Sequence, residues 1–113
     1  MTSSLRTSTP VRLFVDDVRF PPDKSWRLVR TAEEALAVMR ASQIDTVSLD
    51  FDLNLREISP GVWREFAARD GLWLVERMIE ERLIWRIPHI LVHSANPVGG
   101  ARMRARLLDA MSA

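Results

Sequence analysis

Four short apolar segments alternate along this chain with segments whose apolar residues recur at helical spacing. The apolar segments cover residues 11–17, 26–30, 46–53 and 89–96. Each is only five to eight residues long and is rich in Val, Leu, Ile and Phe, as expected of strands buried in a sheet. The pattern therefore predicts four strands.

Three segments between and after these strands have the period of amphipathic helices. Each follows a residue that is suited to an N-cap: Thr31, Asp70 and Asn96. Pro97 occupies the first position of the last helix, where proline is favoured. Strands that alternate with helices predict an α/β domain with a parallel sheet and right-handed crossovers.

The segment from Asn54 to Arg69 has no clean period and contains Pro60 and Gly61. We expect a long loop here, with a helical turn near residues 62–68 as one option. The loop carries Trp63 and Phe66, as a lid over a site would. Trp63 is the tryptophan that we expect to contact a ligand.

Composition narrows the class of protein. The chain has 113 residues, of which 47% are hydrophobic and 27% charged, and its formal net charge is +1. This size fits one domain, which we place at residues 11–113 behind a flexible tail of residues 1–10. The absence of cysteine excludes a disulfide scaffold and a thiolate metal site.

The first ten residues, MTSSLRTSTP, contain no apolar core and so resemble neither a secretory signal nor a membrane anchor. We therefore expect a cytoplasmic protein that has no membrane partner. The arginines at positions 102, 104 and 106 form only a mild basic patch near Asp109, which indicates a solvated helix face. We accordingly expect no binding to duplex nucleic acid.

Polar side chains gather where three of the four predicted strands end. In an open parallel sheet, ligands bind at the carboxyl ends of the strands. Four carboxylates at one edge repel one another unless a hard cation lies between them. We therefore expect Mg²⁺ or Mn²⁺ here, although the aspartates could instead cap turns and pair with arginines. The polar residues at these ends are Asp16, Asp17, Asp50, Asp52, His93, Ser94 and Asn96.

This ordered set resembles the response-regulator receiver domain, a flavodoxin-like phosphoacceptor module. The matching features are an acid pair after the first strand, an Asp after the third, a Ser-Ala pair after the fourth, and Asp70-Gly71 at the start of a helix. The resemblance implies that Asp16 and Asp17 hold the metal and that Asp50 is the phosphoacceptor. It also implies that Ser94 contacts a phosphoryl group and that Asp52 lies where receivers offer a backbone carbonyl to the metal.

The chain also departs from receivers. It has no counterpart of their first helix, fifth strand and fifth helix, and its single lysine, Lys24, is not placed to contact a phosphoryl group. With the segments DDVRFPP, SLDFDL and HSANPVG, these departures resemble the cyclic-phosphate processing receiver domain family. That resemblance implies a reduced receiver-like parallel sheet of about four strands, in the order 2-1-3-4, with about three helices.

The chemistry of opening a cyclic phosphodiester suggests roles for the residues at the strand ends. His93 is the natural acid or base because its unperturbed pKa lies nearest neutrality, and Asp50 could instead attack directly. In receivers, a lysine after the fifth strand pairs with the phosphoryl oxygens, and this chain has no lysine in that place. Arg19 could replace it as the cationic partner of the phosphate. Each residue also has a structural alternative, such as hydrogen bonding for His93 and pairing with Asp16 or Asp17 for Arg19. The remaining candidate phosphate ligands are Ser94, Asn96, Gly99 and Gly100.

Two functions remain open at this point. The first is a metal-dependent phosphoesterase that acts on a 2',3'-cyclic nucleotide, an RNA end or an ADP-ribose cyclic phosphate. The second is a non-catalytic signalling or adaptor module that binds a phosphorylated ligand or a protein partner. The missing lysine argues against a third, a genuine phosphoacceptor. We also expect one sheet face to lack helices, and the Phe20 loop, the C-terminal helix or a second subunit to cover it.

Overall fold

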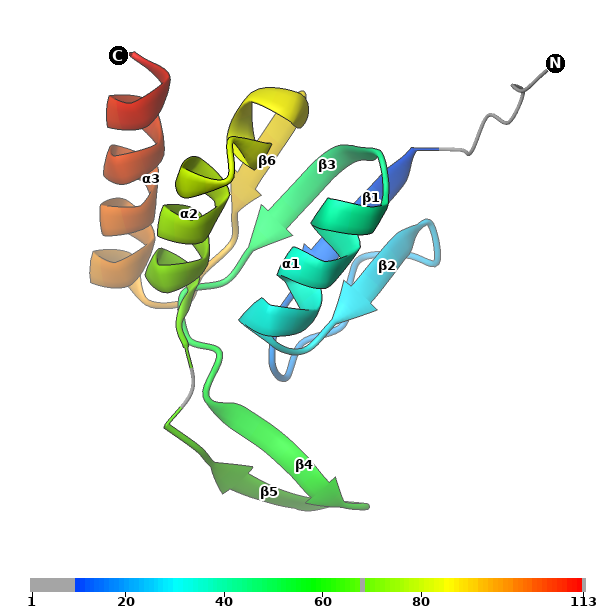
Figure 1. The fold of residues 1–113 in the computed structure, drawn as a ribbon. Coiled ribbons are helices and arrows are strands. Elements are labelled where there is room, and N and C mark those ends of the chain that lie inside the picture. The colour runs from blue at the N-terminus through cyan, green and yellow to red at the C-terminus, as the bar shows by residue number, and fades with distance from the viewer. Residues whose placement is uncertain (1–9, 68, 113) are drawn as a thin grey trace, which may run out of the picture.

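The computed structural model describes residues 10–67 and 69–112, so residues 1–9 of the predicted tail lie outside it. Four strands form a parallel sheet in the order β2-β1-β3-β6 (Figure 1). Because β6 is the fourth strand of this sheet in chain order, the arrangement confirms the predicted order 2-1-3-4. The strands are β1 (Val11–Val15), β2 (Trp26–Val29), β3 (Ile44–Leu49) and β6 (His89–Val92).

Three helices and one 3₁₀ turn accompany these strands, and the last helix follows the last strand. They are α1 (Ala32–Ala41), α2 (Gly71–Glu80), the 3₁₀ turn η1 (Leu83–Arg86) and α3 (Pro97–Met111). Each helix begins at the predicted cap: the side chains of Thr31, Asp70 and Asn96 accept hydrogen bonds from the amides of Glu34, Trp73 and Gly99. These bonds satisfy amides that a helix start leaves without partners.

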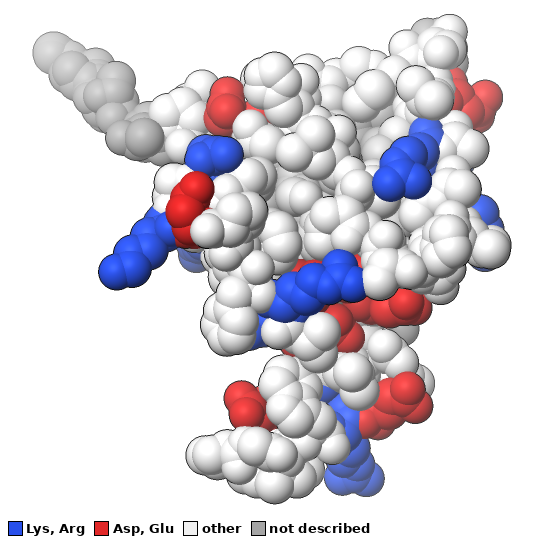
Figure 2. Space-filling view, turned by 180° about the vertical axis from the view of Figure 1, so that it is seen from behind, with Lys and Arg blue, Asp and Glu red and all other residues white. Residues whose placement is uncertain are grey.

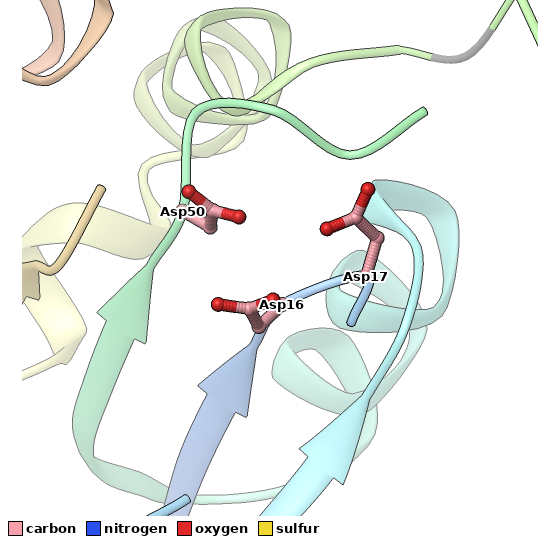
Figure 3. Close-up of side chains that lie close together, drawn as sticks. All are labelled: Asp16, Asp17 and Asp50. Atoms are coloured by element: carbon pink, nitrogen blue, oxygen red, sulfur yellow. The ribbon is translucent and has the colours of Figure 1, made fainter. Parts of the chain in front are cut away.

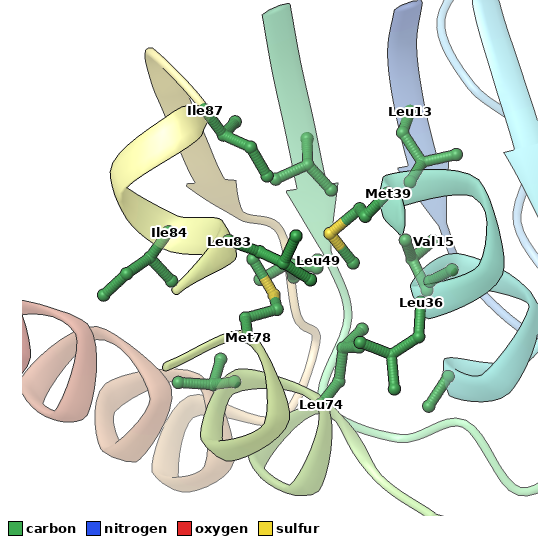
Figure 4. Close-up of a cluster of buried hydrophobic side chains, with 14 of the residues drawn as sticks. Leu13, Val15, Leu36, Met39, Leu49, Leu74, Met78, Leu83, Ile84 and Ile87 are labelled. Carbon is green, nitrogen blue, oxygen red and sulfur yellow. The ribbon is translucent and has the colours of Figure 1, made fainter. Parts of the chain in front are cut away.

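All three helices lie on one side of the sheet, where they bury the core (Figures 1 and 4). The strands present Leu13, Val15, Val47 and Leu49 to this side, and all four side chains are fully buried. Helix α3 stays beside α2 and does not cross to the other side (Figure 1). The described residues therefore lack counterparts of a receiver's first and fifth helices and of its fifth strand, as predicted.

The opposite face of the sheet is covered by no helix of the described residues. Figure 2, which views this side, shows mostly uncharged atoms over the sheet. Charged atoms of both signs gather in a band at the lower edge of the sheet. Phe20, which we expected to help cover this face, is exposed, and the guanidinium of Arg30 lies over its ring.

The prediction of a strand over residues 46–53 was wrong at its ends, because β3 runs from Ile44 to Leu49. The amide of Asp50 still donates to the carbonyl of Val15, but the next carbonyl, that of Phe51, accepts from the amide of Gly71. The chain thus leaves the sheet toward α2. Asp50 and Asp52 do not project from one face of a strand. The fourth strand likewise ends at Val92, so His93 and the residues after it belong to the loop before α3.

The prediction of a loop over residues 54–69, with a helical turn near 62–68, was also wrong. This segment contains an antiparallel hairpin of β4 (Leu55–Ser59) and β5 (Val62–Glu65). Pro60 and Gly61 occupy its turn, and Gly61 has a φ of 77°. Proline followed by a left-handed glycine is the signature of a type II turn. The hairpin lies beyond the carboxyl ends of the parallel strands (Figure 1).

No helix in residues 10–67 or 69–112 combines the length and the apolar character that crossing a membrane requires.

Candidate functional site

Three aspartates converge at the carboxyl ends of the two central strands (Figure 3). Asp16 and Asp17 follow β1, and Asp50 follows β3. All three side chains are buried. One carboxylate oxygen from each lies within 4.8 Å of the others, and no other group of this kind occurs among the described residues.

Backbone hydrogen bonds fix the acid pair. Oδ1 of Asp16 accepts from the amides of Val18 and Arg19 at 3.0 and 2.8 Å. This turn occupies the position where a receiver's first helix would begin. Oδ2 of Asp17 accepts from the amide of Leu55 at 2.9 Å, which connects the first residue of the hairpin to the cluster. Both carboxylates are therefore held before any ligand binds.

Close packing of two glycines fixes the segment that carries Asp50. A Cβ on Gly71 would lie 2.2 Å from the backbone oxygen of Asp50, and one on Gly99 would lie 2.3 Å from the ring of Phe51. Only glycine permits these approaches. The Asp70-Gly71 pair thus has two local functions: Asp70 caps α2, and Gly71 lets the helix start pack against the Asp50 backbone.

Burial and mutual repulsion separate the pKa values of the three carboxyl groups. Burial, followed by the charge of Asp16, raises the pKa of Asp50 to about 6. Burial also raises the pKa of Asp17, and the charge of Asp16 adds to this effect, although the amide of Leu55 opposes it. For Asp16, burial is opposed by hydrogen bonds from His93 and from the amides of Arg19 and Val18, and these bonds leave its pKa lowered.

The donor set fits a hard divalent cation. All three candidate ligands are carboxylates, and oxygen ligands are those that Mg²⁺ and Mn²⁺ prefer. The raised pKa of Asp50 shows that its charge is not fully compensated by groups of the chain itself. A divalent ion between the carboxylates would supply that compensation.

His93 lies at this edge of the sheet, and both of its ring nitrogens have partners. Nε2 is 2.9 Å from Oδ2 of Asp16, and Nδ1 is 2.6 Å from the hydroxyl of Ser48. The ring stacks on Phe14 with centroids 4.3 Å apart. Its side chain is 20% exposed. In this arrangement His93 is a hydrogen-bonding residue that orients Asp16. This is the structural alternative to catalysis that the sequence left open for His93.

Among the described residues, Arg19 is the one arginine or lysine whose side-chain nitrogen lies within 4.0 Å of a carboxylate oxygen of the cluster. Its Nη1 lies 3.7 Å from Oδ2 of Asp16 and donates to the carbonyl of His93 at 3.0 Å. The side chain is 44% exposed, so a ligand can still reach it. Nη1 of Arg30 donates to the carbonyls of Asp16 and Arg19 and thereby supports the same turn. Arg19 therefore contacts Asp16, as its structural alternative requires, and its side chain also remains accessible to solvent. Its contact with a phosphate remains a prediction.

The hydroxyl of Ser94 accepts from the amide of Asn96 at 3.1 Å, and it opposes the rise in the pKa of Asp50. The contact of Ser94 with a phosphoryl group, which the resemblance implied, remains a prediction. Asp52 is different. Its side chain is exposed and does not join the cluster, although its charge contributes to the raised pKa of Asp17. A backbone contact from Asp52 to a metal remains a prediction.

The other expected phosphate ligands already have partners inside the chain. The side chain of Asn96 accepts from the amide of Gly99 at 2.9 Å, and the amide of Gly100 donates to the carbonyl of Asn96 at 2.8 Å. Both glycines are buried. These bonds begin α3, and they leave neither amide free for a phosphate oxygen.

Two residues of this site were missed from the sequence: Ser48 and Phe14, the partners of His93. Both lie on the sheet face that no helix covers, directly opposite each other in the register of β1 and β3. The signal was the alternation within β3, where Ser48 separates the apolar residues Val47 and Leu49. A buried hydroxyl in such a position requires a polar partner.

The family model described as cyclic-phosphate processing Receiver domain matches residues 11–109. No curated protein matches, and no solved structure matches.

Proposed function

The chain belongs to the cyclic-phosphate processing receiver domain family, and from this premise we propose that it is a metal-dependent phosphoesterase that opens a cyclic phosphate. The candidate substrates are a 2',3'-cyclic nucleotide, an RNA end with a cyclic phosphate and an ADP-ribose cyclic phosphate. The proposed ion is Mg²⁺ or Mn²⁺.

One observation carries this proposal: the three buried carboxylates of Asp16, Asp17 and Asp50, whose oxygens lie within 4.8 Å of one another. Burying three acids is costly unless their charge is neutralised. A bound divalent ion would offset two of their three negative charges, and it would supply Lewis-acid polarisation of a phosphate oxygen. Asp16, Asp17 and Asp50 would hold the ion.

The residues around the cluster bind and orient the substrate in this proposal. Arg19 offers a planar guanidinium to the phosphate oxygens, because its side chain remains accessible beside Asp16. The hydroxyl of Ser94, next to Asp50, contacts another oxygen of the phosphate. His93 keeps Asp16 in place through Nε2. For His93 also to move a proton, as its residue type predicts, its bond to Asp16 must open when the substrate binds.

The alternative is an adaptor module that binds a phosphorylated ligand without turnover. The occupied ring nitrogens of His93 favour it, because neither nitrogen is free to accept a proton from water or from a substrate. A genuine phosphoacceptor is disfavoured, since the only lysine of the chain is Lys24. That residue lies in the loop before β2, at the amino end of the strand.

The test is incubation of the purified protein with the three substrate classes in Mg²⁺ and in EDTA. Ring opening is followed as conversion of the cyclic phosphate to a phosphomonoester by phosphorus NMR. We expect opening in Mg²⁺ only, with loss of activity in Asp50→Asn and weaker substrate binding in Arg19→Ala. A small phosphodonor should leave no stable phosphoaspartate. Binding of all three substrates without ring opening would contradict the proposed enzyme and support the adaptor module.

A further inference from the structure

Two arginines face each other across the hairpin. Arg56 of β4 is directly opposite Arg64 of β5 in the register of the two strands. Directly opposite residues of an antiparallel pair project to the same face, and like charges in such positions are destabilising. An isolated two-stranded hairpin is itself only marginally stable in water. The arginine pair therefore needs a reason other than the stability of the hairpin.

The neighbouring acids do not neutralise this pair. Among the described residues, no carboxylate lies within 4.0 Å of a side-chain nitrogen of Arg56 or Arg64. The two acids of the hairpin are bonded elsewhere: Glu57 accepts from the amide of Gly61 at 2.9 Å, and Glu65 accepts from the side chain of Asn54 at 3.3 Å. Two positive charges on one face thus remain without a counter-charge.

Further contacts give this face the character of an anion site. Nε of Arg56 is buried and has no hydrogen-bond partner in the structure. Both guanidinium groups lie over the ring of Phe66, at 5.4 Å for Arg56 and 5.6 Å for Arg64. The ring keeps the two planar groups together, and a guanidinium plane offers paired donors that match phosphate oxygens.

The hairpin that carries the arginine pair is bonded to the acid cluster through the residue before Arg56. Leu55, the residue before Arg56, donates its amide to Oδ2 of Asp17. The backbone of Arg56 is one residue, about 3.3 Å, further along the strand than Leu55. The hairpin lies beyond the carboxyl ends of the parallel strands, which is the end of the sheet that carries the acid cluster (Figures 1 and 3).

We propose that Arg56 and Arg64, supported by Phe66, bind a second phosphate of the substrate, separate from the cyclic phosphate at the acid cluster. The inference rests on the proposed function for the position of the first phosphate. It narrows the substrate class to molecules with at least two phosphate groups. These are an RNA end, whose second group is the adjacent phosphodiester, or an ADP-ribose derivative, whose second group is the diphosphate. A 2',3'-cyclic mononucleotide lacks this group.

Binding of reaction products by calorimetry tests this inference whether or not the protein turns substrate over. Adenosine 3'-monophosphate carries one phosphate, whereas the diribonucleotide ApAp and ADP-ribose 1''-phosphate carry more. We expect the parent protein, in Mg²⁺, to bind at least one of the latter two about tenfold or more tightly than the monophosphate. The preferred one identifies the source of the second phosphate. Added salt should shrink the preference, because it arises from ionic contacts.

The variant Arg56→Gln/Arg64→Gln should bring the affinities for all three ligands to within about twofold of each other and leave the affinity for the monophosphate unchanged. Arg27→Gln is the matched control, since Arg27 is also exposed but lies in β2, and it should keep the parent's preference. If the double variant does not fold, Arg64→Gln alone serves, because this side chain is exposed. Equal affinities in the parent, no binding at all, or a parent-like preference in the arginine variant would overturn the inference.

Discussion

The acid cluster and the hairpin lie next to each other but are built in opposite ways. Each aspartate of the cluster is buried. Backbone amides hold the carboxylates of Asp16 and Asp17, and the amide that holds Asp17 belongs to Leu55, the first residue of the hairpin. The strands of the hairpin pair only with each other, and Ile58, Val62 and Trp63 are all more than 40% exposed. The cluster is therefore determined by the whole domain, whereas the hairpin is determined by its own turn.

This difference separates two tasks that an enzyme site must perform. Chemistry requires groups whose positions do not change, and buried groups with backbone hydrogen bonds provide them. Recognition of a larger ligand tolerates an exposed element that can adjust, as binding loops do on rigid scaffolds. In the proposed function, chemistry belongs to the cluster and recognition to the hairpin.

The two regions should differ most in how much a glycine-to-alanine substitution lowers the free energy of unfolding of the domain. Gly71→Ala places a Cβ 2.2 Å from the backbone oxygen of Asp50 and 2.8 Å from the side chain of Met103. We expect a loss of about 3 kcal/mol in the free energy of unfolding, measured by urea denaturation.

Gly61→Ala is the matched control in the hairpin. Nothing lies within 4 Å of its added Cβ, but its φ of 77° is unfavourable for alanine. This strain should cost about 1 kcal/mol within the hairpin and leave the urea midpoint of the domain nearly unchanged. Equal losses for the two alanine variants would mean that the hairpin and the sheet unfold as one unit.

His93→Ala should lower turnover about a hundredfold, which is the usual effect of removing a general acid or base. It also removes the bond to Asp16, so metal affinity should fall by about tenfold or more. Turnover is therefore measured over a range of Mg²⁺ concentrations. A reduction that persists at saturating Mg²⁺ supports proton transfer by His93. Full recovery at high Mg²⁺ would limit His93 to orienting Asp16.

Asp50→Asn should stabilise the metal-free protein. The pKa of Asp50 is raised from 3.8 to about 6 in the folded state, so its ionisation costs folding free energy. This cost is absent below pH 3.8, grows as the pH rises toward 6, and is complete above that pH. We expect the variant to gain about 3 kcal/mol over the parent at pH 7 and nothing near pH 3. A gain that does not change with pH would contradict the assigned pKa.

Much of the sheet and of the cluster could be predicted from the sequence, because their signals are local. Thr31, Asp70 and Asn96 cap helices through bonds to residues only three positions away. Asp16 and Asp50 come together because parallel strands end at one edge. Neither inference requires knowledge of side-chain packing.

The missed features depend on distant contacts or on a turn. His93 and Ser48 are 45 positions apart, and their bond follows from the register of β3 and β6. The end of β3 is set by the close approach of Gly71 to Asp50. The hairpin did have a local signal in Pro60-Gly61, which is typical of a type II turn. Its exposed strands lack the apolar alternation that would have supported that signal.

Thermal melting with and without divalent metal tests the central claim most directly. We expect millimolar Mg²⁺ or Mn²⁺ to raise the Tm of the parent protein by about 5 °C, as binding at tenfold over the Kd would do for a domain of this size. In metal-free buffer, Asp50→Asn should melt above the parent and should lose the response to metal. A parent Tm that does not change with metal, together with an Asp50→Asn variant that melts no higher than the parent in metal-free buffer, would contradict a metal site at Asp16, Asp17 and Asp50.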